Sequence, residues 1–147
     1  MQQFKTVFIA ATLSALPLCA AKAVEDKLPG PIPAQVVRVV DGDTVVVRAR
    51  IWLGQDVETH VRLAGIDTPE KRGRCDEERN QALKAQAFAE AQLANGEISL
   101  RDIVPDKYGQ RVVAHVITAK GEDLSQLLVA QRLARAYDGG HKQPWCE

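Results

Sequence analysis

Acidic residues gather at two turn-like positions of the sequence. Asp43 belongs to "DGDT" at residues 41–44, and Asp67 and Glu70 belong to "DTPE" at residues 67–70. Each motif borders an apolar run typical of a strand, so both can stand at the ends of neighbouring strands. Three carboxylates, together with a carbonyl and water, suit a hard divalent cation, Ca²⁺ more readily than Zn²⁺. The alternative is that both motifs are ordinary turns with solvated acids.

A single arginine, Arg62, interrupts the apolar run "VRLAGI" at residues 61–66. Arginine is seldom buried without a partner, so Arg62 must either pair with a carboxylate or face a cleft. In a regular strand Arg62 and Asp67 would point to opposite faces, because they are five residues apart. A bulge at Gly65 would bring both onto one side, and we expect this arrangement.

A cation held by carboxylates beside an arginine is the arrangement that phosphodiester hydrolysis requires. The cation and the guanidinium offset the charge that grows on the phosphate, and a carboxylate activates or orients water. The basic run "KRGR" at residues 71–74 follows "DTPE" directly and would help to hold a polyanionic strand. By itself such a run is also typical of a solvated loop.

Strand-like runs position these motifs. The first part of the chain reads "AQVVRVV" (34–40), "TVVVRARIWL" (44–53) and "VETHVRLAGI" (57–66), joined by short turns. These runs predict an antiparallel meander. Two later runs, "EISLRDIV" (97–104) and "RVVAHVIT" (111–118), predict two further strands.

Two helices are predicted between and after the later strands. The first has Asp76 as its N-cap and ends before Asn95-Gly96, and the second begins near Asp123. This order of elements matches a five-stranded barrel of the oligonucleotide-binding (OB) type, an α+β fold that is mainly β, with two or three helices. An α+β sandwich with the same order of elements is the alternative.

Residues 1–23 are typical of a secretory signal peptide. A lysine precedes the apolar run at residues 6–21, and small residues stand at the −3 and −1 positions of a cleavage site after Ala23. The run is shorter than the roughly 20 apolar residues that span a membrane. Cys19 would be a site for a lipid anchor, but Leu18 stands where a small residue is required. We expect an exported protein, periplasmic or secreted, without stable membrane association.

The rest of the chain is expected to form one domain. "VEDKLPGPIP" at residues 24–33 is polar and proline-rich and is predicted to be a linker, whereas residues 34–147 are predicted to form the domain. Beyond residue 23 the chain holds 17 basic and 19 acidic residues, so bulk charge does not favour nucleic acid. Any such binding has to come from local charge placement.

Two cysteines lie beyond the predicted cleavage site, Cys75 and Cys146. In an oxidising compartment an even pair indicates a disulfide. Closing so long a loop is worth about 4 kcal/mol in the chain-entropy description. A metal site is the alternative, but the three histidines show no Cys/His zinc spacing. The disulfide is the better interpretation.

Three ordered motifs, "DGDT", "VRLAGIDTPE" and "DKYG" followed closely by arginine, resemble the thermonuclease (micrococcal nuclease-like) family of secreted Ca²⁺-dependent nucleases. The similarity runs from about Val36 to about Tyr137. The resemblance implies an OB-type barrel with helices. It also implies endonucleolytic and exonucleolytic cleavage of single-stranded or unpaired DNA and RNA, with 3′-phosphate products, and we expect a monomer.

The resemblance also implies roles for residues of the acidic motifs and the strand before them. Asp43 and Asp67 would be Ca²⁺ ligands, with Thr68 adding its backbone carbonyl. Glu70 would be the general base or would orient the attacking water, and Arg62 would contact the scissile phosphate.

Substrate-binding residues follow from the same resemblance. Lys107 and Tyr108 of "DKYG" would hold a neighbouring phosphate, and Tyr137 would stack on a base. In the family the second catalytic arginine follows this glycine directly, whereas here Gln110 intervenes. Alignment backwards from the "VVA" run assigns the role to Arg111, with one residue added to the turn.

Two other functions remain as alternatives. A non-catalytic barrel would bind nucleic acid or another polyanion and keep the acids for structure, and a disulfide-tied module would bind a partner without any nucleic-acid role. The nuclease is favoured because a pure binder does not need carboxylates that face a phosphate. The partner-binding module would be favoured only if five side chains failed to converge: Asp43, Arg62, Asp67, Glu70 and Arg111.

Overall fold

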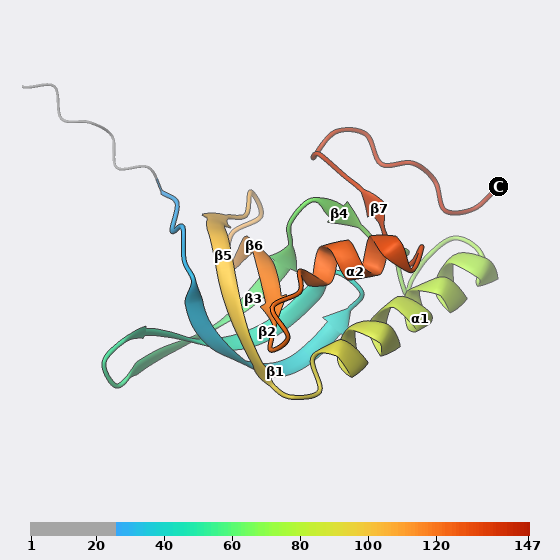
Figure 1. Cartoon of the computed structure of the whole chain (residues 1–147). Helices are drawn as coiled ribbons and strands as arrows, with labels where there is room; N and C mark the ends of the chain where they lie inside the picture. The colour runs from blue at the N-terminus through green and yellow to red at the C-terminus, as the bar shows by residue number, and fades with distance from the viewer. Residues whose placement is uncertain (1–25) are drawn as a thin grey trace, which may run out of the picture.

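A closed barrel forms the centre of the computed structural model, in which residues 26–147 are described (Figure 1). The predicted signal peptide, with Cys19, lies outside the described residues. Five strands build the barrel: β1 (Ile32–Asp41), β2 (Thr44–Trp52), β3 (Gln55–Leu63), β5 (Glu97–Pro105) and β6 (Arg111–Thr118). Two short strands, β4 (Ile66–Asp67) and β7 (Arg135–Ala136), form a separate two-stranded sheet.

The barrel closes in the order β1-β2-β3-β6-β5. β1, β2 and β3 form the predicted antiparallel meander, and β5 pairs antiparallel with β1 and with β6. β3 and β6 pair in parallel, with Arg62 opposite Val113. The prediction of a mainly β, α+β fold with a five-stranded OB-type barrel is confirmed, and the closed sheet excludes the open sandwich.

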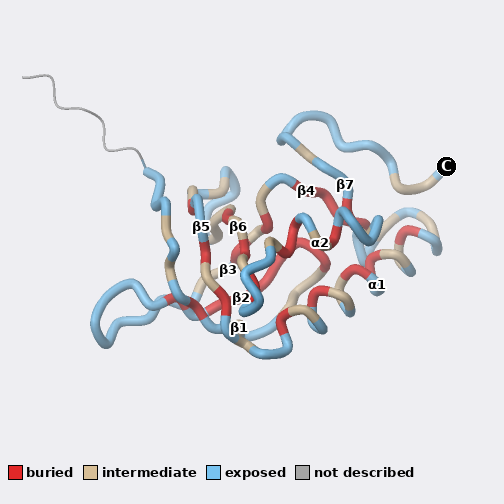
Figure 2. Tube along the Cα trace, in the orientation of Figure 1, coloured by how far each residue is buried: buried red, intermediate tan, exposed pale blue. Residues whose placement is uncertain are grey.

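Within the described residues two helices complete the fold, α1 (Asp76–Gln92) and α2 (Leu124–Ala130). α1 packs on β1, α2 packs on β6, and the helices contact each other (Figure 1). The buried positions follow the strand interiors and the facing sides of the helices, whereas the C-terminal tail is mostly exposed (Figure 2). Within residues 26–147, no helix has the length and apolar character needed to cross a membrane.

The helix starts differ in how well the sequence predicts them. α2 begins near Asp123 as predicted, and Asp123 is its N-cap, because its carboxylate accepts a hydrogen bond of 2.8 Å from the Ser125 N–H. The N-cap of α1 is Cys75, so the prediction of Asp76 is wrong by one residue. Cys75 is extended and its sulfur accepts from the Glu78 N–H, which leaves Asp76 in the first turn, where its charge suits the helix dipole.

The barrel begins earlier than predicted. β1 starts at Ile32, two residues before the expected start of the domain. Leu28 also pairs with Ile103, with hydrogen bonds of 2.9 and 2.8 Å in the two directions. The second half of the segment predicted as a linker therefore joins the sheet, because its backbone groups find partners on β5.

The third strand ends earlier than predicted. β3 stops at Leu63, and Ala64 and Gly65 form a turn that leads into β4. Gly65 has φ +76°, in the left-handed region that glycine adopts without a steric penalty. Gly65 therefore changes the direction of the chain as a turn residue, and the expected bulge inside a continuous strand is wrong.

Alanines let α1 approach the acidic motifs closely. Ala82, Ala85 and Ala89 are fully buried on the helix. A Cβ atom at Gly42 would lie 2.8 Å from the Ala85 Cβ and 3.1 Å from the Thr68 Cγ2, so only glycine fits the "DGDT" turn here. This close packing holds the "DGDT" turn against the "DTPE" segment.

Candidate active site

The two acidic motifs meet at one side of the barrel. Asp43 lies in the β1–β2 turn and Asp67 ends β4. Asp43, Asp67 and Thr68 are all buried, with exposed fractions of 7%, 5% and 3%. The Leu63 N–H donates to the Asp43 carbonyl at 2.8 Å, which ties the end of β3 to the "DGDT" turn.

Arg62 links the "DGDT" turn to the residue that precedes "DTPE". Its Nη1 donates to Asp43 Oδ2 at 2.8 Å, and its Nη2 donates to the Ile66 carbonyl at 3.2 Å. The side chain is only 17% exposed. The turn at Gly65 thus puts Arg62 on the same side as the acids. The ion pair also meets the need of a buried guanidinium for a partner.

Six predicted catalytic and substrate-binding residues line one cavity of about 780 Å³: Arg62, Glu70, Lys107, Tyr108, Arg111 and Tyr137. They come from β3, the loop after β4, the β5–β6 turn, the start of β6 and the segment after β7. Since these segments are far apart in the sequence, their convergence depends on the barrel closure and on the β4–β7 pair. Three of the five side chains whose failure to converge would favour a partner-binding module line this cavity: Arg62, Glu70 and Arg111. Of the other two, Asp43 pairs with Arg62, and Asp67 shares the Lys142 ammonium with Glu70.

The β5–β6 turn absorbs the extra residue before Arg111. Gly109 (φ 66°) and Gln110 (φ 54°) both lie in the left-handed region, which costs a non-glycine residue about 1 kcal/mol. The Gly109 N–H donates to the Asp106 carbonyl, and the Asp106 N–H donates to the Arg111 carbonyl, at 3.0 and 3.1 Å. β6 therefore begins at Arg111, and the insertion does not remove this side chain from the cavity.

Asp106 holds the Arg111 side chain in place. Arg111 Nε pairs with Asp106 Oδ2, and the guanidinium carbon lies 5.4 Å from the centroid of the Tyr108 ring. Burial acts to raise the pKa of Asp106, but the hydrogen bond from Arg111 brings it below its usual value. The sequence analysis missed this role, although Asp106 is the first residue of "DKYG".

The acids fit a divalent cation by their donor chemistry. Asp43 and Asp67 offer buried carboxylate oxygens, and Asp41 accepts a hydrogen bond of 3.2 Å from the Asp43 N–H. Burial and the negative charge of Asp43 raise the pKa of Asp41, as expected for carboxylates that lie close together.

A lysine of the C-terminal tail lies against these acids. Lys142 Nζ is 2.6 Å from Asp67 Oδ1 and 3.5 Å from Glu70 Oε1. Asp67 Oδ1 is buried and accepts no hydrogen bond of good geometry from the described residues. The Lys142 ammonium is therefore the polar group that lies close to this oxygen. Partial burial acts to lower the pKa of Lys142, but the contact with Asp67 and its charge raise it above the usual value.

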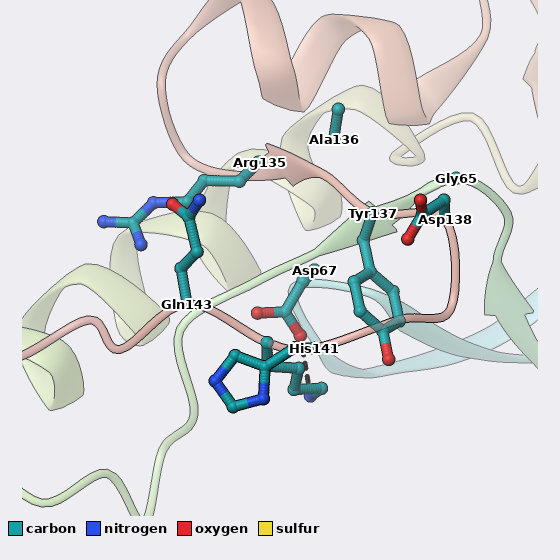
Figure 3. A pocket seen from close by; sticks show the side chains of 9 residues that line it. Gly65, Asp67, Arg135, Ala136, Tyr137, Asp138, His141 and Gln143 are labelled. Atoms are coloured by element: carbon teal, nitrogen blue, oxygen red, sulfur yellow. Dashed lines mark ion pairs between the residues drawn. The ribbon is translucent and has the colours of Figure 1, made fainter.

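The second oxygen of Asp67 also contacts the tail. Trp145 Nε1 donates to Asp67 Oδ2 at 3.1 Å. Figure 3 shows Asp67 pointing from β4 towards the tail segment that carries His141 and Gln143. Both oxygens of one predicted cation ligand therefore meet tail residues that the sequence analysis did not single out.

Cys75 and Cys146 form a disulfide, with their Cα atoms 6.0 Å apart. The ligand atoms of these cysteines and of Glu78 lie within 4.8 Å of one another, which is close enough for a metal site. The two sulfurs are bonded to each other, however, and are not thiolates. Glu78 instead accepts hydrogen bonds from the N–H groups of Glu70 and Arg74, at 3.4 and 3.1 Å. This cluster therefore shapes the loop at residues 70–74.

The basic run "KRGR" forms that loop. Lys71, Arg72 and Arg74 are exposed. Arg72 and Arg74 line a cavity of about 460 Å³ together with Glu70 and Lys142, next to the acids. The loop thus adds positive charge to the border of the site, where a polyanion would benefit from it.

Comparison with known proteins gives one family. The sequence model of the family described as "Staphylococcal nuclease homologue" matches residues 60–144, which is more than half of the chain. The matched segment begins in β3 and contains Arg62, Glu70 and Arg111, whereas Asp43 precedes it. A search of curated proteins found no match.

Proposed function

This chain belongs to the staphylococcal nuclease homologue family, and we propose that it is a Ca²⁺-dependent nuclease that hydrolyses phosphodiester bonds of DNA and RNA. The family is generally one of nucleases and nucleic-acid-binding modules and is typically metal-dependent. The observation that carries the proposal is the cavity shared by Arg62, Glu70 and Arg111, beside the buried acids.

Asp43 and Asp67, with the backbone carbonyl of Thr68, would hold the cation. Carboxylate and carbonyl oxygens are the ligands that Ca²⁺ prefers, and Asp67 Oδ1, which accepts no hydrogen bond of good geometry and is in contact with the Lys142 ammonium, is an oxygen that a cation could bind. When bound, the cation would offset negative charge on the phosphate and favour ionisation of water. Thr68 is held at this position by its contact with the "DGDT" turn.

The two arginines would bind the phosphate oxygens that carry the growing charge. Arg62 is held by Asp43 and by the Ile66 carbonyl, and Arg111 is held by Asp106. Guanidinium groups that are fixed before the reaction need no reorganisation when the charge develops, which is the most effective form of electrostatic stabilisation. Both would act from one wall of the cavity because β3 and β6 are neighbours.

Glu70 would activate or orient the water. Its side chain is 66% exposed and lines the same cavity, so it can accept a proton from a water molecule beside the phosphate. The oxygen of that water would bond to phosphorus as the bond between phosphorus and the 5′ oxygen breaks, and the leaving 5′ oxygen would take up a proton from solvent. The products would be a 3′-phosphate and a 5′-hydroxyl.

The border of the cavity suits a flexible, unpaired strand. Tyr108 is 72% exposed beside Lys107, whose Nζ lies 5.0 Å from the ring centroid, and the pair would hold a neighbouring phosphate. Tyr137 is fixed by a hydrogen bond of 2.9 Å from its hydroxyl to the Gly140 carbonyl, and its ring would stack on a base. Stacking requires a base that is free of its duplex, which supports single-stranded or unpaired substrates.

Incubation of the purified protein with single-stranded DNA tests this function. We expect cleavage in Ca²⁺, and loss of cleavage with chelator or in Glu70→Ala. Glu77→Ala, which removes an exposed acid from α1, is the matched control and should cleave like the wild type. Intact substrate under every condition would contradict the proposal.

A non-catalytic binder of nucleic acid is the second candidate. The observation that favours it is the Lys142 ammonium, which already neutralises part of the acidic cluster and makes the cavity more attractive to an anion. Retention of DNA in a gel-shift assay, without cleavage in Ca²⁺, would favour this second function.

We also propose that the protein is exported, to the periplasm or the medium, and acts as a monomer. Residues 1–23 and the Cys75–Cys146 disulfide support an oxidising compartment. Cell fractionation and size-exclusion chromatography with light scattering test these two points.

A further inference from the structure

The C-terminal tail, residues 138–147, contacts the acids that would hold the cation. We propose that this tail is an internal competitor of the cation and that Lys142 is the competing group. The inference rests on the proposed function, because it concerns the same acids. It makes the metal affinity of the site depend on how the tail is held.

The position of Lys142 requires such a competition. Its Nζ lies 2.6 Å from Asp67 Oδ1, and Ca²⁺ binds carboxylate oxygens at about 2.3–2.6 Å. An ammonium and a divalent cation therefore cannot both occupy the space in front of this oxygen. Glu70, 3.5 Å from the same Nζ, contacts the lysine from the other side. A cation that binds Asp67 has to move the ammonium away first.

The rest of the tail keeps Lys142 at this position. Trp145 donates to the other oxygen of Asp67, at 3.1 Å. Arg135 of β7 donates to the Pro144 carbonyl at 3.0 Å, and its guanidinium carbon lies 3.8 Å from the centroid of the Trp145 ring. These contacts hold the segment directly after Lys142 against Asp67 and β7.

The disulfide adds a covalent restraint to the same segment. Cys146 is four residues after Lys142 and is bonded to Cys75, at the N-terminus of α1. A restraint so close in sequence keeps the ammonium near the acids at a high effective concentration. Breaking the disulfide lets the tail move away from the acids, so Lys142 competes less strongly with the cation for Asp67.

The lysine does not have to leave the site when a cation displaces it. Lys142 also lines the 780 Å³ cavity that holds Arg62 and Arg111. Its side chain is 45% exposed, so the four-carbon stem can turn towards solvent within the cavity. The exchange of ammonium for cation therefore needs a change of rotamer, and the barrel keeps its structure.

Calcium binding without substrate tests the inference. Isothermal titration of the full chain with CaCl₂ should give a dissociation constant about five- to tenfold lower for Lys142→Ala than for the wild type, because the cation no longer displaces a charged competitor. Lys142→Arg keeps the positive charge and should stay close to the wild type. Lys84→Ala removes the same charge from the exposed side of α1 and should change the affinity little.

Reduction of the disulfide gives a second arm. Mild reduction, with far-UV circular dichroism to verify the fold, should shift the wild type towards the affinity of Lys142→Ala and leave that variant unchanged. Equal Ca²⁺ affinity in the wild type and Lys142→Ala would overturn the inference and leave the proposed nuclease intact. No Ca²⁺ binding by any variant would overturn both, because the metal site itself would be absent.

Discussion

Replacing Gly42 by alanine tests how the protein holds its two acidic motifs together. The new Cβ atom would lie 2.8 Å from the Ala85 Cβ and 3.1 Å from the Thr68 Cγ2. Carbon atoms in a packed interior prefer about 3.5–4.0 Å, so the first contact is short by roughly 1 Å. Neither neighbour is a long flexible side chain that could turn away, so α1 or the "DGDT" turn has to move.

The size of the effect follows from this overlap. Forcing extra carbon into a packed site typically costs about 1–3 kcal/mol, and 2 kcal/mol lowers the melting temperature of a domain of this size by roughly 10 °C. The shift would also separate Asp43 from Thr68. A displacement of 1 Å at a reacting centre costs about a hundredfold in rate, so nuclease activity should fall more steeply than stability.

A double-mutant cycle with Ala85→Gly is the assay. Ala85→Gly alone should cost about 1 kcal/mol as a glycine inside a helix. Ala85→Gly also removes the Cβ atom that the new methyl group of Gly42→Ala would overlap. The double mutant should therefore be more stable than the sum of the two single effects predicts, by about 1 kcal/mol or more. Free energies of unfolding from urea titrations give this coupling. Strict additivity, or a Gly42→Ala protein that melts like the wild type, would refute the packing argument.

The remaining predictions concern the disulfide and the arginines. Reduction of Cys75–Cys146 should lower the melting temperature, since its loop entropy is worth about 4 kcal/mol, and an unchanged transition in scanning calorimetry would contradict the bridge. Asp106→Ala releases Arg111 and should lower kcat by about tenfold or more while the fold, followed by circular dichroism, persists. Because Arg111 lowers the pKa of Asp106, their pair stabilises the protein above the usual pKa of an aspartate and ceases to do so as the pH falls through the lowered value. The unfolding free energies of the wild type and Arg111→Ala should therefore converge in acid, and a constant difference would refute this. Arg62→Ala leaves the buried Asp43 carboxylate without its ion pair and should cost about 3 kcal/mol in urea unfolding, whereas a loss below 1 kcal/mol would contradict the pairing.

Local sequence patterns were enough to predict the strands, but they left an OB-type barrel and an α+β sandwich open. The runs that became β2, β5 and β6 are apolar, rich in β-branched residues and bounded by turn residues, and these features act between near neighbours in the chain. The cap at Asp123 is equally local, because its carboxylate reaches an N–H two residues away. The pairing of β3 with β6, which closes the barrel, was not predicted, since parallel pairing of strands far apart in the sequence leaves no short-range pattern.

The errors arose where a long-range contact decides a local feature. β1 begins at Ile32 because the preceding segment finds hydrogen bonds on β5. The N-cap of α1 is Cys75 and not Asp76, and Cys75 is the residue that forms the disulfide with Cys146. Gly65 forms a turn because β4 pairs with β7, a strand from the other end of the sequence.

The sequence by itself determined which residues could do the chemistry: "DGDT", "DTPE" and "DKYG" are short motifs, so adjacency alone made them visible. Only the tertiary structure decided what those residues contact. The ion pair of Lys142 with Asp67 and the packing of Gly42 on Ala85 join positions that no periodic pattern relates. Such contacts form only when barrel closure, the β4–β7 pair and the disulfide are all in place. Each of these restraints removes only part of the conformational entropy of the chain, so none of them positions the contacts alone.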